Sequence, residues 1–176
     1  DVVEQVTVSL GEVVGASPAD KALTLLPLST LLANIAGVYA PLYNGSTAYV
    51  PDLADCGVSG STGVRTDQLV AALHRYQPTV TVLVPHLLKI LVEAATQGAS
   101  LPSSLRYIAV GGAPVSTLLL KRARSLGLPV YQGYGLSEAA SVVSMNVAGQ
   151  DCIRGVGRPL PHTRVRIAAD GEIMVG

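Results

Sequence analysis

Residues that could handle a nucleotide gather in one short stretch, where Tyr134 stands between Gly133 and Gly135, and Ser137 and Glu138 follow. Glycine lets the backbone approach a ligand closely or take a positive φ. The tyrosine offers a flat ring on which a base can stack, and a hydroxyl beside a carboxylate suits a phosphate and its magnesium ion. The ordered set predicts a nucleotide site, and the alternative is a plain structural loop.

A second glycine pair, Gly111–Gly112, stands between an apolar run at 105–110 and a helix-like segment at 117–125. In open parallel sheets, ligands bind at the carboxyl ends of the strands, where such loops lie. Two adjacent glycines could equally form a tight turn without a ligand. Because the glycine–tyrosine stretch follows the next strand, both loops are expected at the same sheet edge, which favours a shared pocket.

Apolar, β-rich runs alternate with amphipathic segments along most of the chain. Expected strands cover 21–26, 46–50, 79–84, 105–110 and 129–132, and expected helices cover 30–43, 67–76, 85–96 and 117–125. Thr66 is expected to cap the second helix, and an Ala-rich segment after Ser137 to begin another. The stretch 52–63, rich in Gly and Ser, is expected to be a flexible loop. The β-α order predicts parallel pairing with right-handed crossovers.

The last stretch changes pattern, because 163–167 and 172–175 alternate on either side of Asp170–Gly171. This pattern predicts a β-hairpin. We therefore expect residues 1–158 to form one α/β unit and 159–176 to be the truncated start of a β-subdomain. The predicted fold class is α/β, a mainly parallel sheet flanked by helices, with the start of a small antiparallel β-subdomain at the C-terminal end.

Composition excludes several classes of protein. The 176 residues suffice for one domain, with 49% hydrophobic and 14% charged residues, which fits a parallel sheet buried on both faces. The longest apolar candidate, 22–50, is broken by prolines and asparagines, so no transmembrane segment is expected. A net charge of +0 gives no basic face for nucleic acid. Cys56 and Cys152 lack metal-like spacing and are typical of unpaired thiols in a reducing compartment, so we expect a cytoplasmic protein.

The stretch 132–138, Gln-Gly-Tyr-Gly-Leu-Ser-Glu, resembles the adenylate-binding motif of the acyl-adenylate-forming superfamily. That superfamily holds acyl-CoA synthetases, luciferases and the adenylation domains of peptide synthetases. Upstream, 111–114 resembles its Gly-Gly-Ala-Pro turn beside the adenine and the acyl group. Downstream, 155–161 resembles its Gly-x-x-Gly-x-Pro entry into a small β-subdomain. Near the start, 25–29 is similar to the Leu-Pro-Leu stretch before the helix that lines the acyl pocket.

The resemblance implies a nucleotide site at the two glycine loops. Its residues would be Gly112, Ala113, Pro114, Gln132, Gly133, Tyr134, Gly135 and Ser137. The backbone around Gly112–Ala113 would meet the adenine edge, and Tyr134 would stack on the ring. Ser137 stands where threonine is common and would contact the α-phosphate, while Glu138 would hold magnesium; these two are the expected catalytic residues. The alternative for Glu138 is a carboxylate in the first turn of a helix.

The resemblance also implies an acyl pocket, lined by Thr30, Leu32, Ala36, Gly111 and Gly112. Family members often carry an aromatic residue or histidine just after the Leu-Pro-Leu stretch, whereas this chain has small polar residues there. The family's acyl-chain selectivity therefore does not carry over. The apolar helix at 30–43 would suit a fatty or aryl group, and it could equally be a plain core helix.

By this resemblance, the chain is the central fragment of an ATP-dependent carboxylate–CoA ligase, expected to use ATP, Mg2+ and coenzyme A on a small carboxylic acid, foremost a fatty acid. The alternatives are an adenylation domain of a peptide or polyketide synthetase and a non-catalytic nucleotide-binding module. The family's phosphate-gripping loop would precede Asp1, and its ribose-binding aspartate and catalytic lysine would follow Gly176. The chain alone is thus expected to be inactive and to self-associate through uncovered apolar surface.

Overall fold

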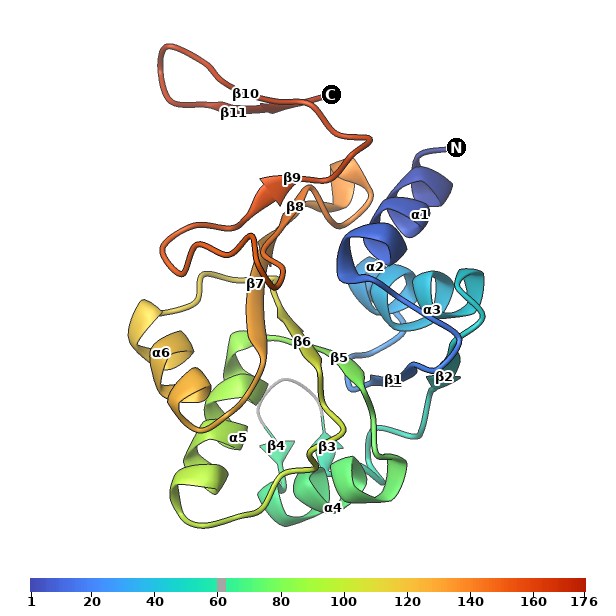
Figure 1. Ribbon diagram of the computed structural model, residues 1–176, viewed down its shortest axis with the longest axis vertical. Coiled ribbons are helices and arrows are strands. Elements are labelled where there is room, and N and C mark those ends of the chain that lie inside the picture. The colour runs from blue at the N-terminus through green and yellow to red at the C-terminus, as the bar shows by residue number, and fades with distance from the viewer. Residues whose placement is uncertain (60–62) are drawn as a thin grey trace.

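A seven-stranded sheet forms the centre of the molecule in the computed structural model, which describes residues 1–59 and 63–176 (Figure 1). Its strand order is β2-β1-β5-β6-β7-β8-β9. The strands are β1 (Lys21–Thr24), β2 (Thr47–Tyr49), β5 (Val80–Leu83), β6 (Tyr107–Val110), β7 (Val130–Tyr134), β8 (Ser144–Met145) and β9 (Arg158–Pro159). From β2 to β7 all neighbours are parallel, and β8 and β9 continue the sheet antiparallel. The predicted mainly parallel sheet is confirmed.

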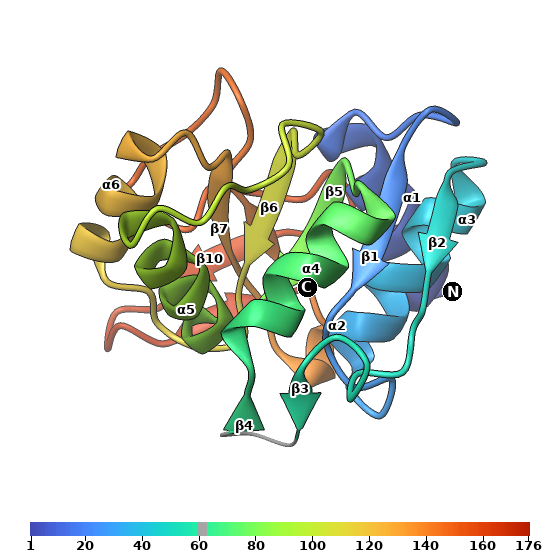
Figure 2. The same ribbon diagram turned by 90° about the horizontal axis from the view of Figure 1, so that it is seen from below.

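Helices cover both faces of this sheet. They are α1 (Val2–Val14), α2 (Leu31–Asn34), the π-helical segment η1 (Ile35–Tyr39), α3 (Ala40–Tyr43), α4 (Thr66–Tyr76), α5 (Pro85–Thr96) and α6 (Thr117–Ser125). Figure 2 shows α4, α5 and α6 on one face, with α1 and the continuous helix α2–η1–α3 on the other. The core lies between these layers, and Leu23, Leu83 and Ile108 in its strands are no more than 1% exposed. The bounds of α5 and α6 agree with the prediction.

Helix α1 was not among the expected elements. The carboxylate of Asp1 caps it by accepting a hydrogen bond from the N–H of Val3 at 2.9 Å. Val6 and Leu10, four residues apart, are buried against the core. The helix ends at Gly15, whose φ of 62° is the left-handed conformation that glycine tolerates. The capping aspartate and the i, i+4 pair are the signals in the sequence by which this helix could have been expected.

The helix expected at 30–43 begins at Leu31 and contains a π-helical segment in its middle. The hydroxyl of Thr30 caps it, because it accepts a hydrogen bond from the N–H of Ala33 at 3.4 Å. Within the π segment, the carbonyl of Gly37 accepts a hydrogen bond from the hydroxyl of Thr24 on β1. A Cβ on Gly37 would stand 2.5 Å from that hydroxyl oxygen, so only glycine lets the helix pack this closely on the sheet.

Two local expectations were wrong. Thr66 is the first residue of α4 rather than its cap; Arg65 is the cap and gives no side-chain hydrogen bond. The stretch 52–63 is not only loop, since it contains β3 (Val58–Ser59) and the first residue of β4 (Gly63–Val64), and these two strands pair antiparallel. The flexibility expected for this stretch falls partly on residues 60–62, which lie outside the described residues.

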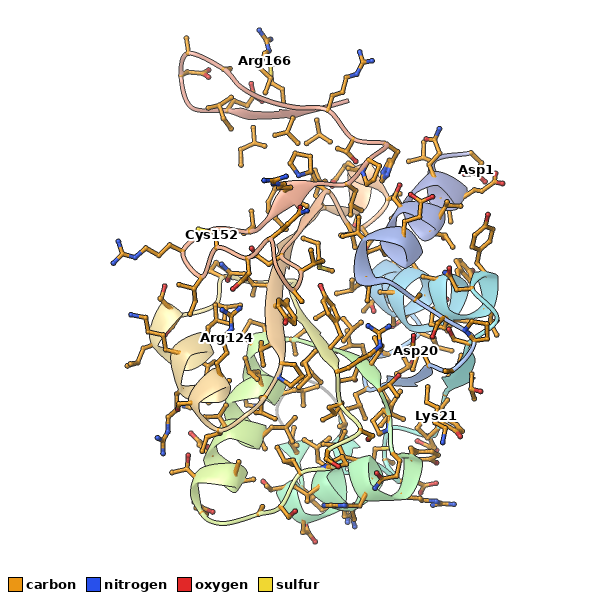
Figure 3. The ribbon with its side chains drawn as sticks, in the orientation of Figure 1. Asp1, Asp20, Lys21, Arg124, Cys152 and Arg166 are labelled. Atoms are coloured by element: carbon orange, nitrogen blue, oxygen red, sulfur yellow. The ribbon has the colours of Figure 1, made fainter. Side chains whose placement is uncertain are left out.

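An ion pair between Asp20 and Arg106 links the end of α1 to the amino-terminal ends of the strands. Asp20, 5% exposed, precedes β1 and accepts hydrogen bonds from the Nε and Nη2 of Arg106 and from the hydroxyl of Thr79. The same guanidinium donates to the carbonyls of Val14 and Gly15 at the end of α1. The bonds from Arg106 hold the pKa of Asp20 well below its usual range. Figure 3 shows Asp20 between the end of α1 and the strands.

The C-terminal hairpin has the predicted antiparallel pairing. It consists of β10 (Val165–Ile167) and β11 (Ile173–Val175), with Val165 opposite Val175. It stands apart from the main sheet at the end of the molecule where β9 lies (Figure 1). Strand β9 spans the expected boundary between residues 158 and 159, and that boundary stays a prediction. Within the described residues, no helix has the length and hydropathy needed to cross a membrane.

Candidate nucleotide and acyl site

A cleft of about 480 Å3 opens at the carboxyl ends of β6 and β7. The loop after β6, the loop after β7 and the start of the α2–η1–α3 helix line it. Of the residues expected in the site, the lining contains Gly111, Gly112, Gly133, Tyr134, Gly135, Ser137, Thr30 and Leu32. The structure thus brings together residues from both glycine loops and from the expected acyl-pocket helix.

The loop after β6 owes its shape to Gly112, whose φ of +80° disfavours any residue with a side chain. The N–H of Gly111 still donates to the carbonyl of Leu83, so the sheet ladder ends only at this residue. Ala113 and Pro114 follow; both are exposed, and neither lines the cleft. Their expected contact with adenine stays a prediction.

Gly133 and Gly135 are required for a reason other than the one expected from the sequence. Neither has a positive φ. A Cβ on Gly133 would stand 2.8 Å from the carbonyl oxygen of Ser144, and a Cβ on Gly135 would stand 1.6 Å from that of Ser141. These glycines therefore permit a close approach of the chain's own backbone at Ser141 and Ser144, which packs against the loop.

The segment that begins at Ser137 is a single 3-10 turn, η2 (Ser137–Ala139), rather than the start of an α-helix. It ends because Ala140 and Ser141 take left-handed conformations, with φ of 51° and 84°. Strain of this kind costs about 1–3 kcal/mol per residue and clusters at functional sites. The N–H of Ser141 bonds to the carbonyl of Leu136 and closes the turn. One 3-10 turn gives Glu138 little helix dipole, which weakens the alternative explanation for its carboxylate.

Ser137 and Glu138 are both exposed, and Ser137 lines the cleft while Glu138 stands just outside its lining. Among the described residues, the carboxylate of Glu138 has neither a hydrogen-bond donor nor an ion-pair partner, and no group of three potential metal ligands occurs. A single free carboxylate suits Mg2+, which usually keeps several waters and binds one or two carboxylates plus substrate phosphates. Residues at this turn therefore fit a magnesium ion brought by a nucleotide.

Gln132 is buried and serves the structure behind the cleft. Its side-chain amide donates to the carbonyl of Gly155. Asn146, which is fully buried, donates to the carbonyls of Gln132 and Gly155 and accepts a hydrogen bond from the N–H of Cys152. The hydroxyl of Tyr107 donates to the carbonyl of Asn146 at 2.7 Å. These bonds fix β7, β8 and the following loop relative to one another.

Further lining residues were not assigned to the site from the sequence. Their positions are Ser29, Leu31, Val82, Ala109, Val110, Leu136, Ser141, Val142 and Met145. Three of them stood in stretches already singled out, Ser29 after the Leu-Pro-Leu segment, Leu31 in the expected apolar helix and Leu136 in the adenylate-binding motif. Ala109 could also have been expected, because it lies two residues before Gly111 on the same face of a predicted strand. Met145 and Val142 reach the cleft only because the chain turns back after η2, which the sequence pattern did not indicate.

Ala36 lines a different, smaller cavity, named here the α1 cavity. It measures about 50 Å3 and lies between α1, the α2–η1–α3 helix and the sheet, with Leu10, Ala40 and Tyr107 in its lining. Val82, Ala109 and Met145 line both cavities. The expected acyl-pocket residues are thus divided between two adjoining spaces.

Known proteins resemble the chain in sequence. A 2-succinylbenzoate–CoA ligase of Lactococcus lactis is 30% identical over 169 residues, 92% of this chain and 34% of that protein. A long-chain-fatty-acid–CoA ligase of Mycobacterium bovis is 40% identical over 77 residues, 44% of this chain and 13% of that protein. The chain therefore spans about a third or less of the length of these curated relatives.

Solved structures share the fold. An anthranilate CoA ligase in complex with anthranoyl-AMP superposes with a TM-score of 0.80 at 16% identity, covering 98% of this chain and 32% of that one. The o-succinylbenzoate CoA synthetase of Bacillus subtilis, bound to its acyl-adenylate intermediate, gives 0.79 at 23% identity, covering 98% of this chain and 33% of that one. A family model described as AMP-binding enzyme matches residues 2–175. With that match over nearly its whole length, the chain belongs to the AMP-binding enzyme family.

Proposed function

We propose that the chain is the central part of a larger AMP-forming acid–thiol ligase. The enzyme would join a carboxylic acid to ATP as an acyl-adenylate, release pyrophosphate, and pass the acyl group to the thiol of coenzyme A. The observation that carries the proposal is the convergence of both glycine loops and Ser137 on one cleft at the carboxyl ends of β6 and β7. Open parallel sheets bind their ligands at this edge.

Each residue has a distinct proposed role. The backbone at Gly112 and Ala113 meets the adenine edge, and Tyr134 stacks on the ring. The hydroxyl of Ser137 donates to an oxygen of the α-phosphate, where negative charge is reorganised as the adenylate forms. Magnesium, when bound beside Glu138, neutralises phosphate charge. The strained turn holds both side chains at the mouth of the cleft, so little reorganisation is needed during the reaction.

The acid is proposed to be a fatty acid or another apolar carboxylic acid. Leu31, Leu32, Val82 and Val142 supply apolar walls to the cleft, and one relative is named as a long-chain-fatty-acid ligase. Other relatives are named for 2-succinylbenzoate or anthranilate, so an aryl acid is the competing choice. Small side chains at Ser29 and Thr30 leave room for either group at the mouth of the cleft.

The test is acid-dependent exchange of labelled pyrophosphate into ATP by the full-length protein, with linear fatty acids and aryl acids compared. Exchange that requires the acid, together with thioester formation when coenzyme A is added, is the expected result. Ser137→Ala should lower the exchange rate about tenfold or more, because it removes a hydrogen bond to a charged group.

Two outcomes would point elsewhere. Exchange without a coenzyme A thioester would favour an adenylation domain that serves a carrier-protein thiol. ATP binding without exchange for any acid would leave a nucleotide-binding module and refute the ligase proposal.

A further inference from the structure

One face of β6 joins the cleft to the α1 cavity. Tyr107, Ala109 and Gly111 share this face because side chains alternate along a strand. Tyr107 lines the α1 cavity, Gly111 lines the cleft, and Ala109 lines both. The strand advances about 13 Å from the first of these residues to the last. The side chains shorten along that path from tyrosine to alanine to glycine, and the shared lining by Ala109 shows that the two spaces adjoin on this face.

The helix above this face of β6 presents a matching row. Leu32 lines the cleft, while Ala36 and Ala40, spaced by four residues, line the α1 cavity. Because both alanines line this cavity, they lie on the side of the helix that faces the sheet. Alanines on the helix and on β6 thus face each other, and the space between them is the α1 cavity. At about 50 Å3, it holds about four water-sized groups, which is room for a short run of methylenes.

The polar side chains that line the α1 cavity already have protein partners. Asp20 is paired with Arg106, the hydroxyl of Ser46 donates to the carbonyl of Ser17, and that of Tyr107 donates to a backbone carbonyl. The remaining lining residues are apolar or glycine. A methylene chain would lose nothing by entering, whereas a second carboxylate would be buried there without a partner at high cost.

Met145 stands at the junction. It is 6% exposed and lines both spaces. Its sulfur lies 2.9 Å from the point where a Cβ on Gly133 would stand, so that glycine makes room for the thioether. Methionine is unbranched and fills irregular gaps. Of the three residues that line both spaces, Met145 has the longest side chain, so its truncation would open the most room between them.

We propose that Met145 is the chain-length stop of the acyl site, and that the enzyme takes monocarboxylic acids with an apolar tail that ends against this thioether. The proposal rests on the proposed ligase function. Truncation of Met145 to alanine removes the side chain beyond its Cβ from the junction, and the tail then extends into the α1 cavity. Each further buried methylene should raise kcat/KM about fourfold.

The test is pyrophosphate exchange by the full-length protein with linear monocarboxylic acids of increasing length, and with dicarboxylic acids of the same lengths. Met145→Ala should move the preferred length up by about two to three carbons, and Met145→Leu, of similar volume, should not. Adding Ala40→Leu to Met145→Ala refills the α1 cavity and should restore the original preference. Val82→Ala removes side-chain atoms from β5 at the same junction and should increase the preferred chain length by about one carbon. This variant provides the test if Met145→Ala does not fold.

Unchanged ratios of kcat/KM between chain lengths in Met145→Ala and Val82→Ala, whatever their absolute rates, would overturn the role of Met145. Equal use of monocarboxylic and dicarboxylic acids in Met145→Ala would overturn the apolar character of the site. The ligase proposal has its own test: if the wild-type protein gives no exchange with any acid, that proposal is refuted, and the inference about Met145 is refuted with it.

Discussion

Ser137 and Glu138 lie in the same 3-10 turn, yet only the serine lines the cleft. A hydroxyl against the cleft wall and a free carboxylate outside it can contact a phosphate and its counter-ion together. The two left-handed residues that follow hold this arrangement in place. The proposed contacts of Ser137 with phosphate and of Glu138 with magnesium therefore depend on the 3-10 turn ending at Ala139.

Replacing Glu138 by glutamine removes one charge and keeps the shape. We expect pyrophosphate exchange by the full-length protein to fall about tenfold to a hundredfold, since hydrogen bonds to charged groups contribute about 1.5–3 kcal/mol. The magnesium concentration for half-maximal rate should rise, because an amide is a weaker ligand for a hard cation. Glu93→Gln, on the exposed face of α5, is the matched control. A wild-type rate in Glu138→Gln would remove this carboxylate from the mechanism.

Gly135→Ala should destabilise the protein by about 2 kcal/mol or more, because its Cβ would overlap the carbonyl oxygen of Ser141. Relief requires the turn to move, so the affinity for ATP should also fall. Gly155→Ala is the control, because its Cβ would find its nearest neighbour at 3.5 Å, an ordinary contact. Denaturant unfolding and ATP titration measure the two effects, and equal stability of the two variants would contradict the steric explanation.

The elements that line the cleft are held in place by contacts outside the cleft. Helix α2–η1–α3 packs on β1 through Gly37, and Asn146 links β7 and β8 to the loop beyond them. At the opposite sheet edge, Arg106 joins α1 to the starts of the strands through Asp20. None of these groups lines the cleft with a polar atom. Their contribution is therefore to position the strands and the helix that line the cleft and to stabilise the fold.

Asp20→Asn tests this edge. The folded-state pKa of Asp20 is depressed, so its stabilisation is present above the unfolded value of about 3.9 and is lost as pH falls toward the folded value. We expect the variant to lose about 1.5–3 kcal/mol at pH 7, at the lower end because the Arg106 side chain is 38% exposed. The deficit should shrink below about pH 4. Urea unfolding across this range measures it, and a deficit independent of pH would exclude the charge as its origin.

On the scale of the whole molecule, exposed apolar side chains occur on several elements, among them α3 and the terminal hairpin. Leu42 and Tyr43, on α3, are 59% and 61% exposed, and Ile167 on the terminal hairpin is 61% exposed. Patches of this kind mark surfaces that pack against other protein. The chain covers 34% or less of the relatives that it matches, and we expect that other parts of a longer protein would cover these patches.

The 176-residue polypeptide should be inactive by itself. Stacking on Tyr134 and a few hydrogen bonds supply only a few kcal/mol, against the cost of immobilising the ligand. We therefore expect ATP to bind no more tightly than about 1 mM, with no acyl-adenylate formed. Calorimetric titration with ATP and magnesium and a pyrophosphate-release assay provide the check. Micromolar binding of ATP or measurable release of pyrophosphate would show that this polypeptide alone suffices for nucleotide binding or adenylate formation.

The same polypeptide should self-associate through the α3 patch, Leu42 and Tyr43. Leu42→Ser together with Tyr43→Ser should shift it toward the monomer, because the substitutions remove apolar area from an exposed surface. Sedimentation velocity at several concentrations gives the distribution. The double variant Leu118→Ser and Val156→Ser changes exposed apolar residues elsewhere and is the control. Equal shifts in both variants would argue against a specific patch.

Periodicity and glycine placement predicted the parallel sheet, the bounds of α5 and α6 and the two loops that meet at the cleft. These features follow from local rules that a sequence carries. The turn back after η2 could not be predicted, since Ala140 and Ser141 are not residues that favour a left-handed conformation. The π segment and the roles of Gly133 and Gly135 depend on contacts between distant parts of the chain, which no local pattern encodes.

Strand β6 has Arg106 before its first residue and Gly111 after its last. The extended chain between them, about 16 Å long, separates the ion pair from the cleft. Effects of substitutions more than about 10 Å apart, with no shared partners, usually add. Changes at Asp20 or Arg106 and changes at the glycine loops should therefore combine additively in free energy. A lineage carrying this fold can gain or lose stability at one end of the strand while substrate preference drifts at the other.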